Sequence, residues 1–210
     1  MVRRIQAVSG LLFAAFLAAH LFNTWLAVLG PGAYDGAQRL LALVYQAPVL
    51  EWLVLGAVLV HVGCALVRWR RERRGTLPLR ARLHRYAGVF LMVVIAGHVN
   101  AVRLVPAAFG IRPGFEGLAF TLQVLPGVFY PYYLVLGLTG AYHGVNGAMV
   151  ALRRLGVALW LPGRWLYGMA GVAAALTLAA LLGFGGALFP VADAGDSAYA
   201  RMAARIFDGG

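Results

Sequence analysis

Residues 86–103 read YAGVFLMVVIAGHVNAVR, an apolar stretch that is typical of a membrane-spanning helix and contains one histidine, His98. Three other apolar stretches also carry one histidine each, namely His20, His61 and His143, and a fifth carries none. An ionisable side chain inside a hydrocarbon span is costly, so its presence indicates a function. Four such residues on four helices predict a shared task around which the chain is organised.

The overall composition is typical of a membrane protein. Of the 210 residues, 62% are hydrophobic and only 12% are charged, and the mean hydropathy is +0.79. The net charge of +11 comes from arginine alone, since lysine is absent. The arginines lie between the apolar stretches, which indicates membrane topology and not nucleic-acid binding. The single cysteine, Cys64, cannot form an intrachain disulfide, and no CxxCH motif is present, so any haem is expected to be held non-covalently.

These stretches predict an all-α membrane protein with five transmembrane helices in a single domain, residues 1–210. A spanning helix needs about 20 apolar residues. The stretches that provide them are 7–30, 49–67, 86–105, 124–152 and 165–189. The segments between them are expected to be loops, at 31–48, 68–85, 106–123 and 153–164, and residues 190–210 form a polar tail. The first stretch is kept as a span because His20 and its polar neighbours have no purpose in a cleaved signal peptide.

The arginines also predict the orientation. Thirteen of the 18 precede the first span or lie in segments 68–85 and 153–164, and five belong to the other side. Because cytoplasmic loops carry the excess of positive charge, the N-terminus is expected in the cytoplasm and the tail outside.

A weak internal repeat relates the first and third spans. It consists of an arginine, a glycine and a histidine that recur 78 residues later: Arg4, Gly10 and His20, then Arg82, Gly88 and His98. The repeat predicts a pseudo-symmetric four-helix bundle with the fifth helix added outside.

The depths of the histidines group them into two pairs. With a helical rise of about 1.5 Å per residue, His61 and His143 lie about 10 and 15 Å from the cytoplasmic ends of their spans. By the same measure, His98 and His20 lie about 18 and 22 Å deep. Two imidazoles at each level predict two bis-histidine b haems, stacked across the membrane.

Small residues near these histidines would let the flat haem approach the helix backbones. The glycines that we expect to do so are Gly63, Gly97, Gly140, Gly144 and Gly147. A fifth histidine, His84, falls in the basic segment 68–85. It is expected to face solvent or lipid headgroups, with contact to a haem propionate or a partner subunit as the alternative.

Other cofactor chemistries fit the sequence less well. A retinal protein needs a lysine for its Schiff base, and a di-iron centre needs several carboxylates inside the bundle. The spans offer only Glu51, near the end of one of them. We therefore expect a chain that carries electrons and does not itself oxidise an organic substrate.

The five spans, the single histidines in the first four and the runs RIQAVSG, LVHVG, GHVN and YHGVNG resemble the b558-type di-haem cytochrome b anchors of succinate dehydrogenase and fumarate reductase. The resemblance covers about the first 150 residues. It implies that His61 and His143 ligate a proximal haem, near a cytoplasmic iron–sulfur subunit, and that His20 and His98 ligate a distal haem. It further implies electron transfer between that subunit and a quinone, with menaquinone expected, in a bacterial cytoplasmic membrane. A flavoprotein subunit would perform the succinate–fumarate chemistry.

The resemblance also suggests further site residues. Arg4, Arg82, Arg85 and Ser9 are candidates for holding haem propionates, because the planar guanidinium fork of arginine binds carboxylates well. The alternatives are membrane topology for the arginines and helix packing for the serine.

Two positions concern the quinone and protons. Glu51 is a candidate for an outer quinone site, and the alternative is a carboxylate at the water interface. Some fumarate reductases of this family carry a glutamate at the position of Ala141, so the proton path attributed to that glutamate is not expected here.

Two other functions remain open. The chain could be the di-haem anchor of a hydrogenase, formate dehydrogenase or nitrate reductase, although those tend to place two histidines on one helix. It could also be a haem-free transporter with a histidine proton relay, which the lack of buried acids disfavours.

Overall fold

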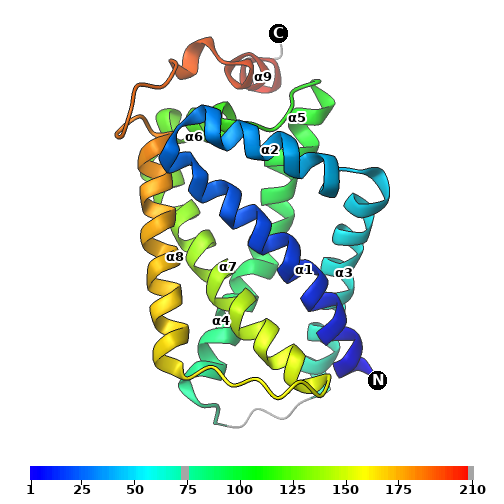
Figure 1. Cartoon of the computed structure of the whole chain (residues 1–210). Coiled ribbons are helices and arrows are strands. Elements are labelled where there is room, and N and C mark those ends of the chain that lie inside the picture. The colour runs from blue at the N-terminus through cyan, green and yellow to red at the C-terminus, as the bar shows by residue number, and fades with distance from the viewer. Residues whose placement is uncertain (72–75, 208–210) are drawn as a thin grey trace.

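The computed structural model describes residues 1–71 and 76–207, which fold into a helical bundle (Figure 1). The predicted basic loop falls partly outside the described residues, at 72–75, as does the end of the predicted tail, at 208–210. The long helices are α1 (Val2–Trp25), α3 (Pro48–Arg71), α4 (Leu79–Val99), α7 (Pro126–Arg154) and α8 (Gly163–Phe184). The shorter elements are η1 (Leu26–Leu29), α2 (Pro31–Tyr45), the π-helical turn η2 (Asn100–Leu104), α5 (Val105–Ala108), α6 (Phe115–Val124), η3 (Ala194–Asp196) and α9 (Ala198–Phe207).

Within the described part of the chain, four helical segments are long and apolar enough to cross a membrane. They are Val2–Leu29, Pro48–Arg71, Leu79–Ala108 and Gly163–Phe184. They correspond to the first, second, third and fifth predicted spans. The fourth predicted span, 124–152, coincides with α7, which is 29 residues long and contains many tyrosines and glycines, a histidine and an asparagine.

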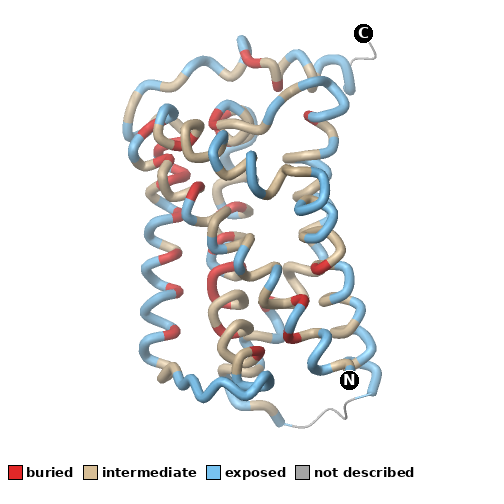
Figure 2. The backbone as a smooth tube through the Cα atoms, turned by 45° about the vertical axis from the view of Figure 1, so that its right-hand side comes forward, coloured by how far each residue is buried: buried red, intermediate tan, exposed pale blue. Residues whose placement is uncertain are grey.

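The long helices surround a common interior. Helix α1 packs against α3 and α7, α4 packs against α7, and α8 packs on the outside of α7. The order around the bundle is therefore α3, α1, α7 and α4. Figure 2 shows that buried residues are concentrated along α7 and α8, whereas α3 and α4 contain one each, Ala57 and Ala87. The four-helix part of the bundle is thus the less tightly filled part.

The two ends of the bundle differ (Figure 1). One end holds the N-terminus and the arginines at the ends of α3 and α7, and we call it the basic end. The other is covered by α2, α6 and α9, and we call it the capped end. There, the Asp35 carboxylate of α2 accepts a hydrogen bond of 2.8 Å from the backbone N of Phe115 at the start of α6. Glu116 of α6 accepts one of 2.8 Å from the backbone N of Ala198 in α9, so the three helices form a connected layer.

Two segments expected to be loops contain helices at this end, so those two predictions are wrong, and the polar tail also contains a helix. Residues 31–48 form α2 and the start of α3, residues 106–123 include most of α6, and the tail contains α9. Pro31, Pro48 and Pro126 each occupy the first position of a helix, where proline costs no intrahelical hydrogen bond. Gly30, with φ of +103°, makes the turn that leads into α2. A proline-and-glycine sequence that indicates a loop is therefore equally compatible with a helix start.

Candidate functional site

The four histidines in the predicted spans meet in two pairs. The ring centroids of His20 on α1 and His98 on α4 lie 6.2 Å apart, with an angle of 76° between the ring planes. Those of His61 on α3 and His143 on α7 lie 6.3 Å apart, at 89°. These are the pairs that the residue depths group together. Each pair joins helices from opposite corners of the bundle.

The spacing within each pair fits a metal held between two imidazoles. A metal–imidazole bond is about 2 Å long, and the ring centroid lies about 1 Å behind the nitrogen, so two rings on one metal have centroids about 6 Å apart. Within the described residues, no group of three or more histidine, cysteine or carboxylate side chains is arranged so that it could hold a metal ion. Two imidazoles at this spacing suit iron that already has four ligands from a macrocycle, as in haem.

The pair at the basic end has its ring nitrogens oriented by backbone carbonyls. Nδ1 of His61 lies 3.1 Å from the carbonyl oxygen of Gln6, and Nδ1 of His143 lies 3.2 Å from that of His84. Because a carbonyl oxygen only accepts, Nδ1 is the donor in both rings. The remaining nitrogen, Nε2, then carries the lone pair that can bind a metal.

Two glycines let the same histidines lie directly against neighbouring helices. A Cβ atom added to Gly10 on α1 would lie 2.8 Å from the ring of His61, and one added to Gly88 on α4 would lie 2.8 Å from the ring of His143. Gly10 and Gly88 are the two glycines of the 78-residue repeat. The two carbonyl acceptors, on Gln6 and His84, are also 78 positions apart. The repeat therefore has a structural meaning, since each copy supplies one carbonyl and one glycine to one histidine.

The other glycines near the histidines have different surroundings. A Cβ at Gly63 or Gly97 would meet nothing within 4 Å, whereas Gly140 and Gly144 face Leu17 of α1. Sequence reasoning selected glycines by their nearness to a histidine in the chain. The glycines against the rings of His61 and His143 are instead those four positions after each carbonyl acceptor, while the expected Gly147 lies against the ring of His84.

His84 does not lie where the sequence predicts. Helix α4 begins at Leu79, so His84 belongs to that helix and not to a loop. Its ring stacks on His143, with centroids 4.1 Å apart and an interplanar angle of 4°, and its Nδ1 is buried without a hydrogen-bond partner. The expectation that it faces solvent or headgroups is wrong. The signal that could have revealed its position is its 78-residue offset from Gln6.

The polar candidates for propionate binding all lie near the basic end. Ser9 is buried, and its hydroxyl donates to the carbonyl of Ile5 in its own helix at 2.9 Å. Arg4, Arg82 and Arg85 have exposed side chains. The Ser9 hydroxyl is thus hydrogen-bonded within α1, while the three arginines have their charge at the surface of this end.

Two further arginine contacts at the basic end were not predicted. Arg68 of α3 donates a hydrogen bond of 2.7 Å to the Gln6 side chain of α1. The guanidinium of Arg85 lies 5.8 Å from the ring centroid of Trp69, which links α4 to α3. Both contacts join helices beside the histidine pair of this end.

Glu51 lies at the end of α3 nearer the capped end and is held in an ion pair. Arg103 binds it bidentately, at 2.7 Å from Nε and 3.1 Å from Nη2. Arg103 lies in the π-helical turn η2, which directly follows the helix that carries His98. The candidate quinone residue is therefore paired with a cation that sequence reasoning did not select.

No protein family model, curated protein or solved structure matches this chain. The assignment of a function rests on the geometry of the histidine pairs and on the sequence pattern that surrounds them.

Proposed function

We propose that this chain is the di-haem cytochrome b membrane anchor of a succinate:quinone oxidoreductase or fumarate reductase. The observation that carries the proposal is the pairing of four histidines from four helices, with ring centroids 6.2 and 6.3 Å apart. This separation fits one iron per pair, and haem iron is the metal that needs only two protein ligands.

In this proposal, His61 and His143 bind the haem iron at the basic end, and His20 and His98 bind the one nearer the capped end. Haem supplies one-electron redox chemistry when bound. The carbonyls of Gln6 and His84 hold the Nδ1 protons of the first pair, which would leave both Nε2 atoms free to bind the iron.

The two sites are stacked along the bundle. Gly10 lies beside the ring of His61, and His20 follows ten residues later on the same helix, a rise of about 15 Å. Gly88, beside His143, and His98 are separated by the same ten residues on α4. Two independent helices thus give the same spacing, which supports a relay of two carriers across the membrane.

The proposal includes α7 as a fifth span. This helix is 29 residues long, about 43 Å at the usual rise, which exceeds the hydrocarbon thickness of a bilayer. Its polar residues do not argue against a span, because α7 packs against α1, α4 and α8, and seven of its residues are buried. They face protein and not lipid.

The basic end is taken as cytoplasmic, since arginine-rich segments remain on that side of a bacterial inner membrane. In this arrangement an iron–sulfur subunit docks at the basic end, where Arg4, Arg82 and Arg85 are exposed, and exchanges electrons with a flavoprotein subunit. A quinone, with menaquinone expected, reacts nearer the capped end, where Glu51 and Arg103 are candidates for its site.

The first experiment is a dithionite-reduced minus oxidised spectrum of the purified chain, with haem quantified per polypeptide. Two b haems per chain are expected. A chain that binds no haem after expression with haem supplied would overturn the proposal and favour a histidine-relay transporter.

The identity of the complex needs a second measurement on membranes that contain the native assembly. Succinate is expected to reduce the haems, and copurification should recover an iron–sulfur protein and a flavoprotein. Reduction by hydrogen or formate, without reduction by succinate, would assign the anchor to another respiratory complex.

A further inference from the structure

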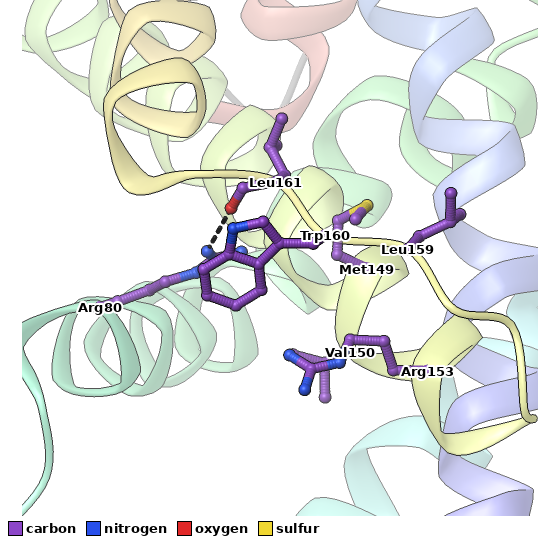
Figure 3. A pocket seen from close by; sticks show the side chains of 7 residues that line it. All are labelled: Arg80, Met149, Val150, Arg153, Leu159, Trp160 and Leu161. Carbon is purple, nitrogen blue, oxygen red and sulfur yellow. Dashed lines mark hydrogen bonds between the residues drawn. The ribbon is translucent and has the colours of Figure 1, made fainter.

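A small cavity of about 140 Å³ opens at the basic end, and none of the paired histidines lines it. Helix α4, helix α7 and the segment that connects α7 to α8 form its walls (Figure 3). Its lining is apolar apart from two arginines and a tryptophan, and the lining residues are Arg80, Met149, Val150, Arg153, Leu159, Trp160 and Leu161. The volume is below the range of about 300–1,000 Å³ that is usual for cofactors and drug-sized ligands. A headgroup fits this space better than a haem or a quinone.

Both arginines converge on the same indole. The guanidinium carbon of Arg80 lies 5.9 Å from the ring centroid of Trp160, and that of Arg153 lies 5.6 Å from it (Figure 3). Cations within about 6 Å of an aromatic face are attracted to it, so the indole helps to hold two like charges close together. Within the part of the chain that the structure describes, neither arginine forms an ion pair with a carboxylate.

Arg80 is fixed in place by hydrogen bonds to neutral groups. Its Nε donates to the Asn146 side chain at 2.6 Å, and its Nη1 donates to the carbonyl of Leu161 at 2.8 Å. Asn146 is 2% exposed, so this guanidinium is anchored in the bundle. Two positive charges, one of them held rigidly, therefore face an apolar cavity.

The connecting segment beside the cavity exposes apolar side chains. Leu155, Val157, Leu159 and Trp160 are between 42% and 70% exposed. Tryptophan is enriched where a membrane meets water, and apolar side chains at that depth contact acyl chains. The cavity thus has cations for a phosphate and, beside it, an apolar surface for the chain of a lipid.

We infer that this cavity binds the phosphate of an anionic phospholipid, with Arg80 and Arg153 on the phosphate and an acyl chain along Leu159 and Trp160. Basic pockets between transmembrane helices on the cytoplasmic side have the chemistry to bind such headgroups. The charge complementarity selects a lipid with a net negative charge over a zwitterionic one. The inference does not depend on haem binding.

The test uses the full-length chain reconstituted into phosphatidylcholine vesicles. A varied fraction of the lipid carries brominated acyl chains, and this brominated lipid is either phosphatidylglycerol or phosphatidylcholine. Bromine quenches tryptophan fluorescence at short range, and the difference between the wild type and Trp160→Phe isolates the signal of Trp160. We expect brominated phosphatidylglycerol to quench Trp160 at lower mole fraction than brominated phosphatidylcholine. Arg153→Gln should reduce this preference about fivefold, because one basic residue near the surface contributes about that factor.

Arg164→Gln is the matched control, since Arg164 lies at the same end but does not line the cavity. It should leave the preference within twofold, and Arg153→Lys should retain most of it. Retained helical circular dichroism in each variant excludes misfolding as the cause. Equal quenching by the two lipids in the wild type would overturn the inference. An unchanged lipid preference in Arg153→Gln would also overturn it. So would disappearance of the preference when inorganic phosphate is added at constant ionic strength, because free phosphate would then be the ligand.

Discussion

The imidazole rings of His84 and His143 lie parallel, 4.1 Å apart, while the carbonyl of His84 accepts the hydrogen bond from His143 Nδ1. One residue of α4 thus fixes both the ring plane and the proton position of a histidine on α7. Gln6 gives His61 a carbonyl in the same way, but its side chain binds Arg68 and does not stack. The two histidines of this pair therefore have different supports.

Replacing His84 with alanine should weaken haem binding at the basic end without affecting the other site. An aromatic stack contributes about 1 kcal/mol, so haem retention there should fall about fivefold. His84→Phe keeps the flat ring and the backbone carbonyl and should restore binding. The readouts are the haem content and the electron paramagnetic resonance signal of each low-spin haem. An unchanged signal in His84→Ala would show that the stack does not position His143.

Removing one histidine of a pair should remove one haem. His61→Ala or His143→Ala should abolish the haem at the basic end, and His20→Ala or His98→Ala should abolish the other, because each iron then has a single axial ligand. The haem content should fall from two to one per chain. The two variants of one histidine pair should retain the same haem and therefore show the same α-band. A His61→Ala spectrum that matches His20→Ala, and not His143→Ala, would contradict the pairing.

Adding a methyl group at Gly10 or Gly88 should disturb the same site. The new Cβ would lie 2.8 Å from the ring of His61 or His143, and overpacking of this kind costs about 1–3 kcal/mol. Gly10→Ala and Gly88→Ala should each lower the thermal midpoint and the haem content at the basic end. Gly168→Ala on α8 is the control, because its Cβ would meet nothing within 4 Å. Equal behaviour of all three variants would exclude the close approach.

The ion pair between Glu51 and Arg103 should contribute modestly to stability. Their side chains are 26% and 32% exposed, so solvent screens the attraction, and a coupling energy of about 1 kcal/mol is expected. The measurement is a double-mutant cycle of Glu51→Ala and Arg103→Ala, followed by thermal unfolding in detergent. Additive effects of the two substitutions would show that the contact carries no coupling.

Alkaline pH should release α9 from the capped end. Burial, together with the Glu116 carboxylate, raises the pKa of Tyr199 to about 12. Because the folded pKa exceeds the unfolded value of about 10, the docked state loses this stability as the pH rises from about 10 through 12. Proteolysis within α9 measures its release, and Tyr199→Phe, which cannot ionise, should shift the release to higher pH. Identical pH profiles would show that another group controls the docking.

The long apolar helices and the grouping of the histidines were predictable because they depend on local periodicity and on a constant rise per residue. His61 and His143 have similar predicted depths from the cytoplasmic ends of their spans, and this similarity does not depend on how the other helices pack. The capped end was not predictable in this way. Pro31 and Gly32 indicate a loop by composition, yet they begin α2, whose stability comes from its packing on η1 and α1.

The supports of the histidines were also hidden from the sequence. Every residue has a backbone carbonyl, so the identity of residue 6 as glutamine does not predict that it is the acceptor for His61. Only the 78-residue repeat, extended from its three matching residues to Gln6 and His84, contains that information. The side chains at these two positions differ, which is why the repeat did not reveal them.

The central place of α7 has a consequence for the synthesis of the chain. On the proposal that α7 crosses the membrane, it is a span that lacks the apolar window present in α1, α3, α4 and α8, and it is the last of the four that carry histidines. Such a helix gains little by partitioning into lipid alone, and its polar residues need protein neighbours. Helices α1 and α4 leave the ribosome before it, while α8 follows after a short connection. Insertion of α7 is therefore expected to wait for α8, so that the two enter the bilayer as a hairpin against helices already in place.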